Sequence, residues 1–561
     1  MNALLVGVAF GLGLTLGAAP SVRPATLTAA EEKAIQTITA HELAADIRFL
    51  ASDLLEGRGP GTRGDQLAQA YVASQFELLG LKPAGEQGGW YQPFQLVGIT
   101  GKPDTLALRG KKGTLTLAYR QDFIAVSGAQ KTSSALEDAE IVFVGYGIVA
   151  PEFQWDDYKG ADLKGKVLLM MNNDPEDDPA LFAGRTRLRY GRWDYKYEIA
   201  AKVGAAGAII IHTTPSAGYP WQVVQTSWAG EQFELPEEPG HHLEVKAWVT
   251  EEKARALTAL GGFDLDALRA QAQRRDFKPV PLDVTINASF QNRLRRITTA
   301  NVLGVLPGSD VKLRDQWVVI TAHHDHLGIQ PGAAPGEDAI YNGAVDNASG
   351  VATMLAMARG LASLPKAPKR SILFAAVAAE EQGLLGSEYL ARHPPRPPGA
   401  LAANLNIDGI NTLGRTADVT MIGLGKSDVD DLILPLAATQ GRKVFPDQLP
   451  DRGYFYRSDQ YNFAKIGVPV VYLGSGLDYR GRPPGWGKQM REKWEAEHYH
   501  QPSDEWDPGW DLSGAVEDAQ LYLLITERIA NAPKMPAWRK GDEFEAARLQ
   551  ALHAVEVPRA R

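Results

Sequence analysis

The sequence predicts an α/β protein whose central sheet is mixed but largely parallel and is flanked by helices. From TTANVLGVLPGSD onward, strand-like runs such as QWVVITA and VPVVYLGSG alternate with helix-like runs such as SGVATMLAMARGLASL. Such alternation is typical of parallel sheets. Ionisable residues also follow directly after several of these strands. A block of short β-type runs, residues 135–292, interrupts the alternation and is predicted to be an inserted, β-rich module.

The length and composition fit a multidomain globular protein. The chain has 561 residues, which predicts two or three domains, and it is 44% hydrophobic and 22% charged. The net charge is −9 and no basic run is present, so nothing indicates a nucleic-acid partner. The chain has no cysteine, which excludes disulfides, thiolate metal sites and cysteine nucleophiles.

Residues 1–19 are predicted to be a signal peptide. The segment from Ala3 to Ala19 is apolar and rich in glycine and alanine, although no basic residue precedes it and the first is Arg23. An uncleaved anchor is the alternative. No other segment is apolar over enough residues to span a bilayer. We therefore expect an exported protein, periplasmic or secreted, with no stable membrane span after cleavage. The oligomeric state stays open.

The remaining segments complete the predicted organisation. Residues 28–134 contain two helical patterns, TAHELAADIRFLASD and GDQLAQAYVASQFELLG, and begin a mixed α/β domain. Residues 135–292 form the inserted module and carry no cluster of ionisable residues suited to catalysis. Residues 293–535 return to regular β and α alternation and contain the candidate site. Residues 536–561 form a C-terminal tail.

Candidate site residues follow the predicted strands. Ligand sites in open α/β sheets lie just beyond the carboxyl ends of strands. Each residue alone also fits a simpler reading, because acidic pairs often lie in solvated turns and aspartates often cap helices. Their shared placement at one sheet edge favours a site. Strand 316–322 precedes His323 and Asp325, strand 371–378 precedes Glu380 and Glu381, strand 402–407 precedes Asp408, and Asp346 precedes a helix.

These residue types suit a hydrolytic zinc site, since imidazole and carboxylate ligands are present without thiolate. Two divalent ions that share one bridging carboxylate would lower the pKa of a water held between them and clamp the reacting carbonyl oxygen. A further carboxylate would take the proton from that water and deliver it to the leaving group. The adjacent Glu380 and Glu381 can divide metal binding and proton transfer between them.

A last ligand is expected in EHYHQPSDEWD. His500 fits better than His498, because Asp504 lies four residues after His500 and metal-bound imidazoles usually donate their other N–H to a carboxylate or carbonyl. The alternative is a surface loop whose histidines have no such role.

With these residues assembled, the chain resembles the co-catalytic di-zinc aminopeptidase family, whose relatives include glutamate carboxypeptidases, transferrin receptors and glutaminyl cyclases. The motifs follow in order as AHHD, GAVDNASG, AAEEQGLLGS, NLNIDG and YHQPSDEWD, and the resemblance covers about 300–530 strongly and 35–130 more loosely. The inserted block resembles a protease-associated domain through ADLKGKVLLM and EIAAKVGAAGAIII, and such domains commonly sit over the active site. The resemblance therefore implies a zinc exopeptidase fold with two Zn²⁺ ions per chain.

The resemblance also implies roles for single residues. It implies that His323 and Asp408 bind one zinc ion, that Glu381 and His500 bind the other, and that Asp346 binds both. It implies that Glu380 acts first as the general base and then as the general acid, and that Asp325 orients His323. It also implies that Tyr499 donates a hydrogen bond to the oxyanion. The loop YFYRSDQYNFAKIGVPVV looks like a family loop near the substrate pocket, in which Arg457, Ser458 and Asp459 contact substrate or, alternatively, cap the next helix.

The expected function is an aminopeptidase that hydrolyses N-terminal amino acids from peptides with a free N-terminus. A carboxypeptidase of the same family is an alternative, since Arg452, Arg457, Arg480 and Arg491 are available to hold a substrate carboxylate. A receptor-like binding protein without catalytic activity is another alternative, but such a protein would be expected to have lost metal-ligating residues. Cobalt or manganese could occupy the same ligands as zinc.

The stretch TAHHDHLG holds three histidines, and strand alternation separates them. Because side chains alternate across a strand, His323 and Asp325 are expected on one side, with His324 and His326 on the other, away from the metals.

Overall fold

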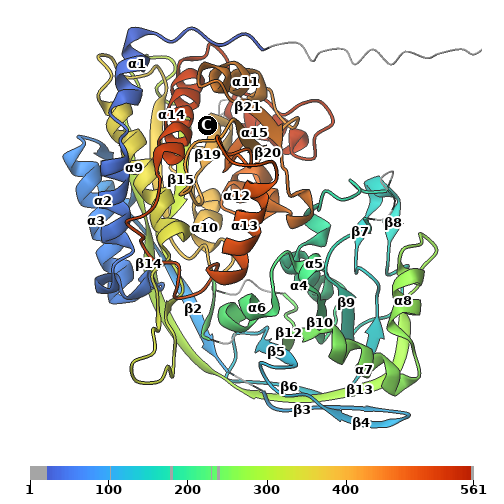
Figure 1. Ribbon diagram of the computed structural model, residues 1–561. Helices are drawn as coiled ribbons and strands as arrows, with labels where there is room; N and C mark the ends of the chain where they lie inside the picture. Colours follow the sequence, from blue (N-terminus) through green and yellow to red (C-terminus); the bar gives the residue numbers. More distant parts are fainter. Residues whose placement is uncertain are drawn as a thin grey trace, which may run out of the picture.

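Our computed structural model describes residues 22–556, apart from 102, 177, 179, 180, 229 and 237–239. The predicted signal peptide, residues 1–19, lies outside the described residues. None of the helices described is both long and apolar enough to cross a membrane. The chain forms two bodies that lie side by side, each built on its own large sheet (Figure 1).

The first body contains a mixed ten-stranded sheet, as the fold class predicts. The order is β11-β2-β14-β18-β15-β19-β22-β20-β21, and β1 pairs with β14. The central strands β18, β15, β19 and β22 are parallel, whereas β2 and β14 pair antiparallel. The strands are β1 (Lys82–Pro83), β2 (Tyr91–Thr100), β11 (Gln232–Glu234), β14 (Arg293–Leu306), β15 (Trp317–His323), β18 (Ser371–Val377), β19 (Leu401–Asn406), β20 (Asp418–Ile422), β21 (Lys443–Pro446) and β22 (Val470–Ser475).

The central strands β15, β18 and β19 are buried along their whole length because helices cover both faces of the sheet. In β15, Val318 and Ile320 pack into one core and Val319 packs into the other, as the two-residue period of a strand requires. The first face packs against α1 (Ala29–Gln36), α2 (Ala40–Leu50), α3 (Arg63–Leu78), α9 (Ser349–Ala362), α11 (Asp430–Thr439) and α14 (Ser513–Asn531). The second face packs against α10 (Leu385–Arg392), α12 (Gln460–Lys465) and residues near α15 (Glu545–Glu556).

The second body contains an eight-stranded sheet with a separate hydrophobic core. Its strands are β3 (Pro103–Gly110), β4 (Gly113–Thr116), β5 (Phe123–Ser127), β6 (Ser133–Phe143), β9 (Val167–Met171), β10 (Gly207–His212), β12 (Val245–Thr250) and β13 (Val280–Gln291). Its helices are α4 (Trp193–Lys202), α5 (Thr214–Ala217), α6 (Trp221–Trp228), α7 (Glu251–Gly261) and α8 (Leu265–Ala272). We call residues 103–291 the inserted module.

The observed start of this module differs from the boundary at 135 that the sequence predicts. Strands β3, β4 and β5 precede residue 135 and belong to the second sheet, where β3 pairs with β13 and β5 pairs with β12. Their partners lie far along the chain, so local patterns before 135 gave no sign of the pairing. The resemblance of this module to a protease-associated domain stays a prediction.

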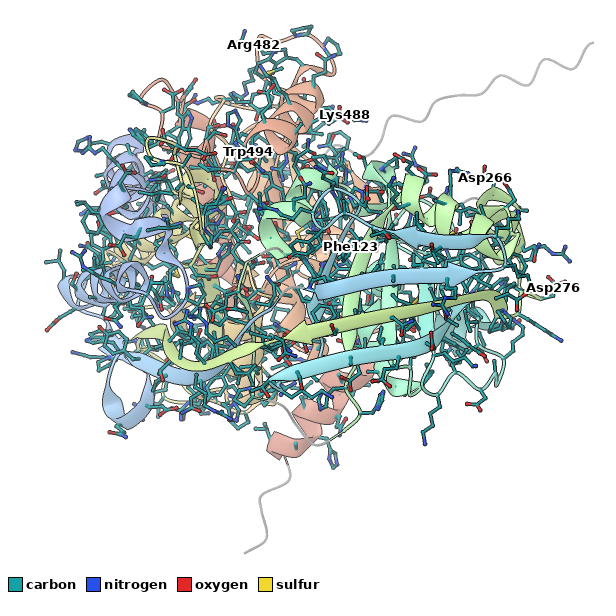
Figure 2. All side chains as sticks on the ribbon, turned by 90° about the horizontal axis from the view of Figure 1, so that it is seen from below. Phe123, Asp266, Asp276, Arg482, Lys488 and Trp494 are labelled. Atoms are coloured by element: carbon teal, nitrogen blue, oxygen red, sulfur yellow. The ribbon has the colours of Figure 1, made fainter. Side chains whose placement is uncertain are left out.

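Two connections tie the module to the first body. Strands β13 and β14 are separated only by Asn292 and carry the chain from one sheet into the other. Strand β11, whose sequence lies within the module's range, pairs with β2 of the first sheet. Figure 2 shows Phe123, Asp266 and Asp276 on the module, whereas Lys488 and Trp494 belong to α13 (Trp486–Glu497) of the first body. Gly218 of the module lines a cavity together with Trp494 of α13, so the module lies beside α13 and the site described next.

Candidate metal centre

The central parallel strands deliver the candidate ligands to one edge of the sheet. His323 is the last residue of β15, Asp408 follows β19, and Glu380 and Glu381 follow β18. Because these three strands are adjacent and parallel, their carboxyl ends meet. The structure thus brings the predicted strand-end residues together.

Asp346 lies in a tight turn between β17 (Ile340–Tyr341) and α9, within residues Ala344–Ala348. The turn begins at Gly343, whose φ of 55° is left-handed and whose added Cβ would lie 2.3 Å from the Asp346 carbonyl oxygen. The Asp504 carboxylate accepts the backbone N–H groups of Val345 and Asp346, each at 3.0 Å. Asp504 therefore holds the Asp346 turn, and it does not pair with His500 as the sequence led us to expect.

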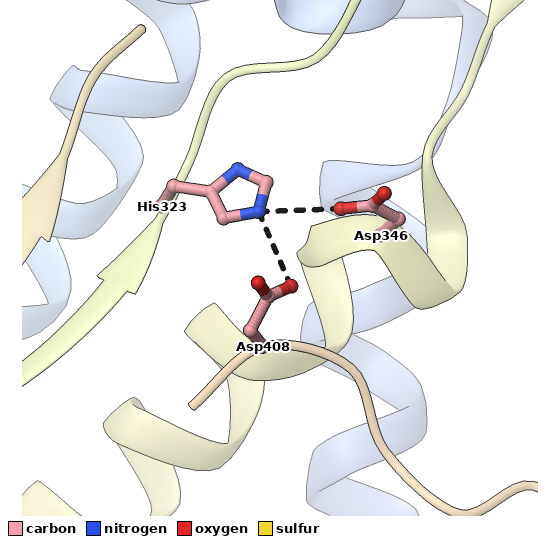
Figure 3. A group of neighbouring side chains, drawn as sticks. All are labelled: His323, Asp346 and Asp408. Carbon is pink, nitrogen blue, oxygen red and sulfur yellow. Dashed lines mark ion pairs between the residues drawn. The ribbon is translucent and has the colours of Figure 1, made fainter. Parts of the chain in front are cut away.

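The two oxygens of the Asp346 carboxylate face opposite sides of the site. His323 Nε2 lies 3.2 Å from Asp346 Oδ1 and 3.4 Å from Asp408 Oδ1 (Figure 3). On the other side, His500 Nε2 lies 3.4 Å from Asp346 Oδ2 and 3.0 Å from Glu381 Oε2. This arrangement offers two adjacent cation positions that share one carboxylate.

His326 departs from its expected position away from the site. Its Nδ1 lies 2.5 Å from Glu381 Oε1, on the same side as His500. The reason is that β15 ends at His323, so strand alternation no longer governs the residues that follow. Both histidines touch Glu381, and ligand atoms of His326, Asp346 and Glu381 also lie within 4.8 Å of one another. His500 fits the second position better, because its Nε2 lies 3.4 Å from Asp346 Oδ2 and 3.0 Å from Glu381 Oε2. His326 instead fixes the orientation of the Glu381 carboxylate.

His324 points away from the site, in agreement with strand alternation. Its Nε2 lies 3.0 Å from Asp65 Oδ1, and both side chains are fully buried. Asp65 also accepts hydrogen bonds from Gln69 and Thr299. His324 is thus part of a buried polar network that attaches α3 to the sheet.

Asp325 supports both His323 and the glutamate pair. The Asp325 carboxylate accepts the backbone N–H groups of Glu380 at 3.1 Å and Glu381 at 3.4 Å. His323 Nδ1 lies 3.3 Å from the Asp325 carbonyl oxygen and 3.7 Å from its carboxylate. The predicted orienting contact therefore runs through the main chain as well as the side chain of Asp325.

The adjacent glutamates have pKa values that are shifted in opposite directions. Burial raises the pKa of Glu380 well above its usual range, and nearby Asp408 and Glu381 add to this, although His323 opposes it. Burial and Asp346 oppose the ionised form of Glu381, but His500 and His326 outweigh them and lower its pKa to about 2. Such a separation is typical of a proton-transferring carboxylate next to a permanently ionised one.

The site has the chemistry of a divalent cation centre. The Nε2 atoms of His323 and His500 are buried and have no hydrogen-bond partner in the part of the chain that the structure describes. Ligand atoms of His323, Asp346 and Asp408 all lie within 4.8 Å of one another. Although burial opposes it, the negative potential of Glu381 and Asp346 raises the pKa of His500 to about 10. The same potential would stabilise bound cations.

Two adjoining cavities, which share several lining residues, open beside these residues. A small one, about 70 Å³, is lined by Asp346, Glu380, Tyr499 and Arg457, with Gly218 of the inserted module. A larger one, about 290 Å³, shares Val345, Asp408, Gly409, Tyr454, Tyr472, Arg491 and Trp494 with the first. The larger cavity is mainly apolar, and its walls include Ile410, Leu413, Ile422, Leu449, Leu473, Leu477, Met490 and Trp494.

The predicted substrate-contact residues occupy different environments. Arg457 and Tyr499 line the small cavity, and Arg457 Nη2 donates to Tyr499 Oη at 3.3 Å. Ser458 also borders it, but its hydroxyl donates to Asp408 Oδ2 at 2.6 Å and so supports a candidate ligand. Asp459 is fully buried and lines neither cavity, which differs from the predicted substrate contact. It does precede α12, but its side chain makes no capping hydrogen bond.

Arg58 is a site residue that the sequence interpretation missed. Its guanidinium is 1% exposed and donates to the carbonyl oxygens of Leu50, His324, Asn342 and Gly343. Burial lowers its pKa to about 10, so it is a cation at neutral pH beside the carboxylates of the site. The only local signal was the glycine-rich EGRGPGTRG, in which Gly57 and Gly61 have positive φ.

Comparison with known proteins adds independent findings. Residues 301–524 match the family model described as Peptidase family M28. Aminopeptidase NAALADL1 of Mus musculus is 34% identical over 137 residues, which are 23% of this chain and 16% of that protein. Aminopeptidase YwaD of Bacillus subtilis (strain 168) is 35% identical over 116 residues, which are 20% and 22% of the two chains. The match thus spans less than a quarter of either relative.

The fold is also similar to a solved structure. The aminopeptidase from Aneurinibacillus sp. strain AM-1 aligns with a TM-score of 0.52 and 20% identity over 90% of this chain and 97% of that chain. This similarity extends beyond the segment matched by the family model and supports the overall fold.

Replacing Arg58 with methionine should destabilise the protein strongly. The change removes a buried cation and leaves four carbonyl oxygens without their donor, so we expect a loss of about 3 kcal/mol or more. The free energy of unfolding from urea titration measures it. Arg63→Met is the matched control, since the Arg63 side chain is 72% exposed and should lose less than about 0.5 kcal/mol. Equal stability of the two variants would contradict the assignment.

Proposed function

We propose that this chain, whose residues 301–524 match the model of Peptidase family M28, is an exported zinc-dependent aminopeptidase. The substrates are peptides with a free N-terminus. The observation that carries the proposal is the carboxylate of Asp346, whose two oxygens face His323 and Asp408 on one side and His500 and Glu381 on the other.

Five side chains would hold two Zn²⁺ ions. His323 and Asp408 would hold one ion, Glu381 and His500 would hold the other, and Asp346 would be shared between them. When bound, the zinc ions would supply Lewis-acid polarisation of the scissile carbonyl and a lowered pKa for the attacking water. Ser458 and His326 orient Asp408 and Glu381 through the hydrogen bonds that each makes to a ligand carboxylate.

Glu380 transfers the proton during peptide hydrolysis. It takes a proton from the attacking water as the oxygen bonds to the carbonyl carbon, and delivers that proton to the leaving nitrogen as the C–N bond breaks. Its raised pKa and its place in the wall of the small cavity support this role. Tyr499 lines the same cavity and can donate its hydroxyl hydrogen to the developing oxyanion.

The arginines near the site favour an aminopeptidase over a carboxypeptidase. A carboxypeptidase needs a cation that is free to bind the substrate carboxylate. Arg452 and Arg491 are both paired with Glu495, at 3.1 and 3.0 Å, and Arg480 lines neither cavity. Arg457 is left and already donates to Tyr499. The carboxylates of the site suit the substrate's free amine better.

The large apolar cavity provides a binding site for the first side chain of the substrate. It adjoins Asp408 and is walled by residues such as Leu473, Met490 and Trp494. Burial of a large apolar side chain there contributes about 1.5–3 kcal/mol, whereas a charged side chain would lose hydration against the mainly apolar walls. Leucine, methionine and phenylalanine are therefore the preferred first residues.

Export and the role of the inserted module are further parts of the proposal. The apolar N-terminal sequence supports a signal peptide, and a periplasmic or secreted location fits a peptidase acting on peptides from outside the cell. Gly218 of the inserted module borders the small cavity, which supports a role for a protease-associated domain in shaping substrate access. A receptor-like protein without catalysis is disfavoured, because the ligand set and Glu380 are all present.

The direct test is hydrolysis of aminoacyl-nitroanilides by the purified full chain. We expect turnover of leucyl and phenylalanyl substrates at least 10-fold above glutamyl or lysyl ones, as a difference of about 1.4 kcal/mol in binding would produce. Treatment with a chelator should abolish turnover, and zinc should restore it.

Peptides with one blocked end distinguish the alternatives. N-acetylation should prevent cleavage, and C-terminal amidation should not. The reverse pattern would support a carboxypeptidase, and no turnover of any unblocked peptide would contradict both.

Two neighbouring histidines should have different effects on metal binding. His323→Ala removes a ligand and should lose at least one of two zinc equivalents together with activity. His324→Ala removes a partner of Asp65, which keeps Gln69 and Thr299, so it should lower stability by about 1–3 kcal/mol and keep both ions. Elemental analysis of the two variants measures this, and equal zinc loss in both would refute the ligand assignment.

A further inference from the structure

One contact of the metal centre comes from the inserted module. The Oγ atom of Ser227, in the last turn of α6, lies 2.9 Å from His500 Nδ1. The two residues are 273 positions apart in the sequence. His500 is 7% exposed, so the contact is shielded from bulk water.

This hydrogen bond fixes which ring nitrogen of His500 can bind a cation. An imidazole that coordinates through Nε2 carries its hydrogen on Nδ1 and needs an acceptor there. Ser227 Oγ provides that acceptor, while His500 Nε2 faces Asp346 and Glu381. The nearby Asp504 is occupied with backbone N–H groups of the Asp346 turn and does not serve.

Helix α6 is attached firmly to the module. The side chains of Trp221 and Gln225 both donate to the Arg120 carbonyl oxygen, at 2.9 and 2.7 Å. The ring of Trp228 packs against Trp193 and Trp248 of the module core. Just beyond α6, Gln232 Nε2 of β11, the strand that pairs with β2 of the first sheet, donates to the carbonyl oxygen of Ser227 at 3.0 Å and holds the end of α6 toward the first body. The position of Ser227 therefore follows the position of the module.

The module is in turn held against the first body close to the site. The backbone N–H of Arg187 donates to the Pro450 carbonyl at 2.9 Å, and Phe233 N donates to Gln382 Oε1 at 3.3 Å. Gln382 directly follows the glutamate pair. Arg457, which lines the small cavity, lies over the Tyr219 ring at 5.4 Å. The position of Ser227 beside His500 thus depends on how the module packs against the first body.

We propose that Ser227 is a positioning residue for His500, so that the inserted module completes one of the two metal positions. The proposal rests on the zinc ligand set put forward above. Loss of the Ser227 hydroxyl leaves the His500 ring free to turn and its Nδ1–H without an acceptor. Loss of such an outer hydrogen bond typically weakens metal binding 10–100-fold.

The test compares Ser227→Thr with Ser227→Val in the full chain. The two variants have nearly the same shape and differ in the hydroxyl, so any strain at the end of α6 is common to both. Zinc affinity is measured by competition with a chromophoric chelator. We expect the threonine variant to bind two equivalents as the wild type does, and the valine variant to bind one of them 10–100-fold more weakly.

Thr226→Val is the matched control on the same helix, because the Thr226 hydroxyl donates only to α6 carbonyl oxygens. It should bind both equivalents normally. The visible absorption spectrum of the cobalt-loaded protein gives a second readout. Among the three variants, only Ser227→Val should change this spectrum, because only this variant alters the surroundings of one cobalt ion.

The outcomes separate this inference from the proposed function. If the wild type binds two ions and the threonine and valine variants do not differ, Ser227 is not a positioning residue and the function stands. If the wild type binds fewer than two ions, the ligand set itself is wrong and both proposals fail.

Discussion

The site depends on how the carboxylate of Asp346 is held. Its two oxygens can face two different histidines only because the turn that carries it is fixed, and Asp504 fixes that turn by accepting two consecutive backbone N–H groups. Asp504 is fully buried and lies in the segment that also carries His500. One carboxylate therefore connects the turn before α9 to the C-terminal loop and sets the spacing between the two cation positions.

Collecting this many carboxylates at a sheet edge is costly unless positive charge offsets it. Arg58 supplies one such charge, and its four hydrogen bonds to carbonyl oxygens join the end of α2 to the loops after β15 and before α9. The negative potential of the carboxylates that Arg58 does not offset acts at the two cation positions beside Asp346. Structural stability and cation binding are thus linked. The repulsion among these carboxylates destabilises the folded protein without metal, whereas bound cations would stabilise the folded protein through the same carboxylates.

The sequence predicted those features that depend on local pattern. The parallel core, the strand ends and the cluster of His323, Glu380, Glu381 and Asp408 follow from strand periodicity and from the rule that parallel strands end together. Features that depend on contacts between residues far apart in the sequence could not be predicted from local patterns. His326 turned toward Glu381 because β15 had already ended. Strand β3 joined the second sheet through the distant strand β13, where Arg109 pairs with Thr285. Ser227 lies in a helix with no local feature that indicates a metal centre.

The central claim is that Asp346 lies between two metal ions. Crystals of the full chain grown with zinc, with anomalous diffraction recorded on both sides of the zinc absorption edge, test it most directly. The account predicts two peaks, one beside Asp346 Oδ1 near His323 and Asp408, the other beside Oδ2 near His500 and Glu381. A single peak, or a pair of peaks in which His326 replaces His500, would contradict it.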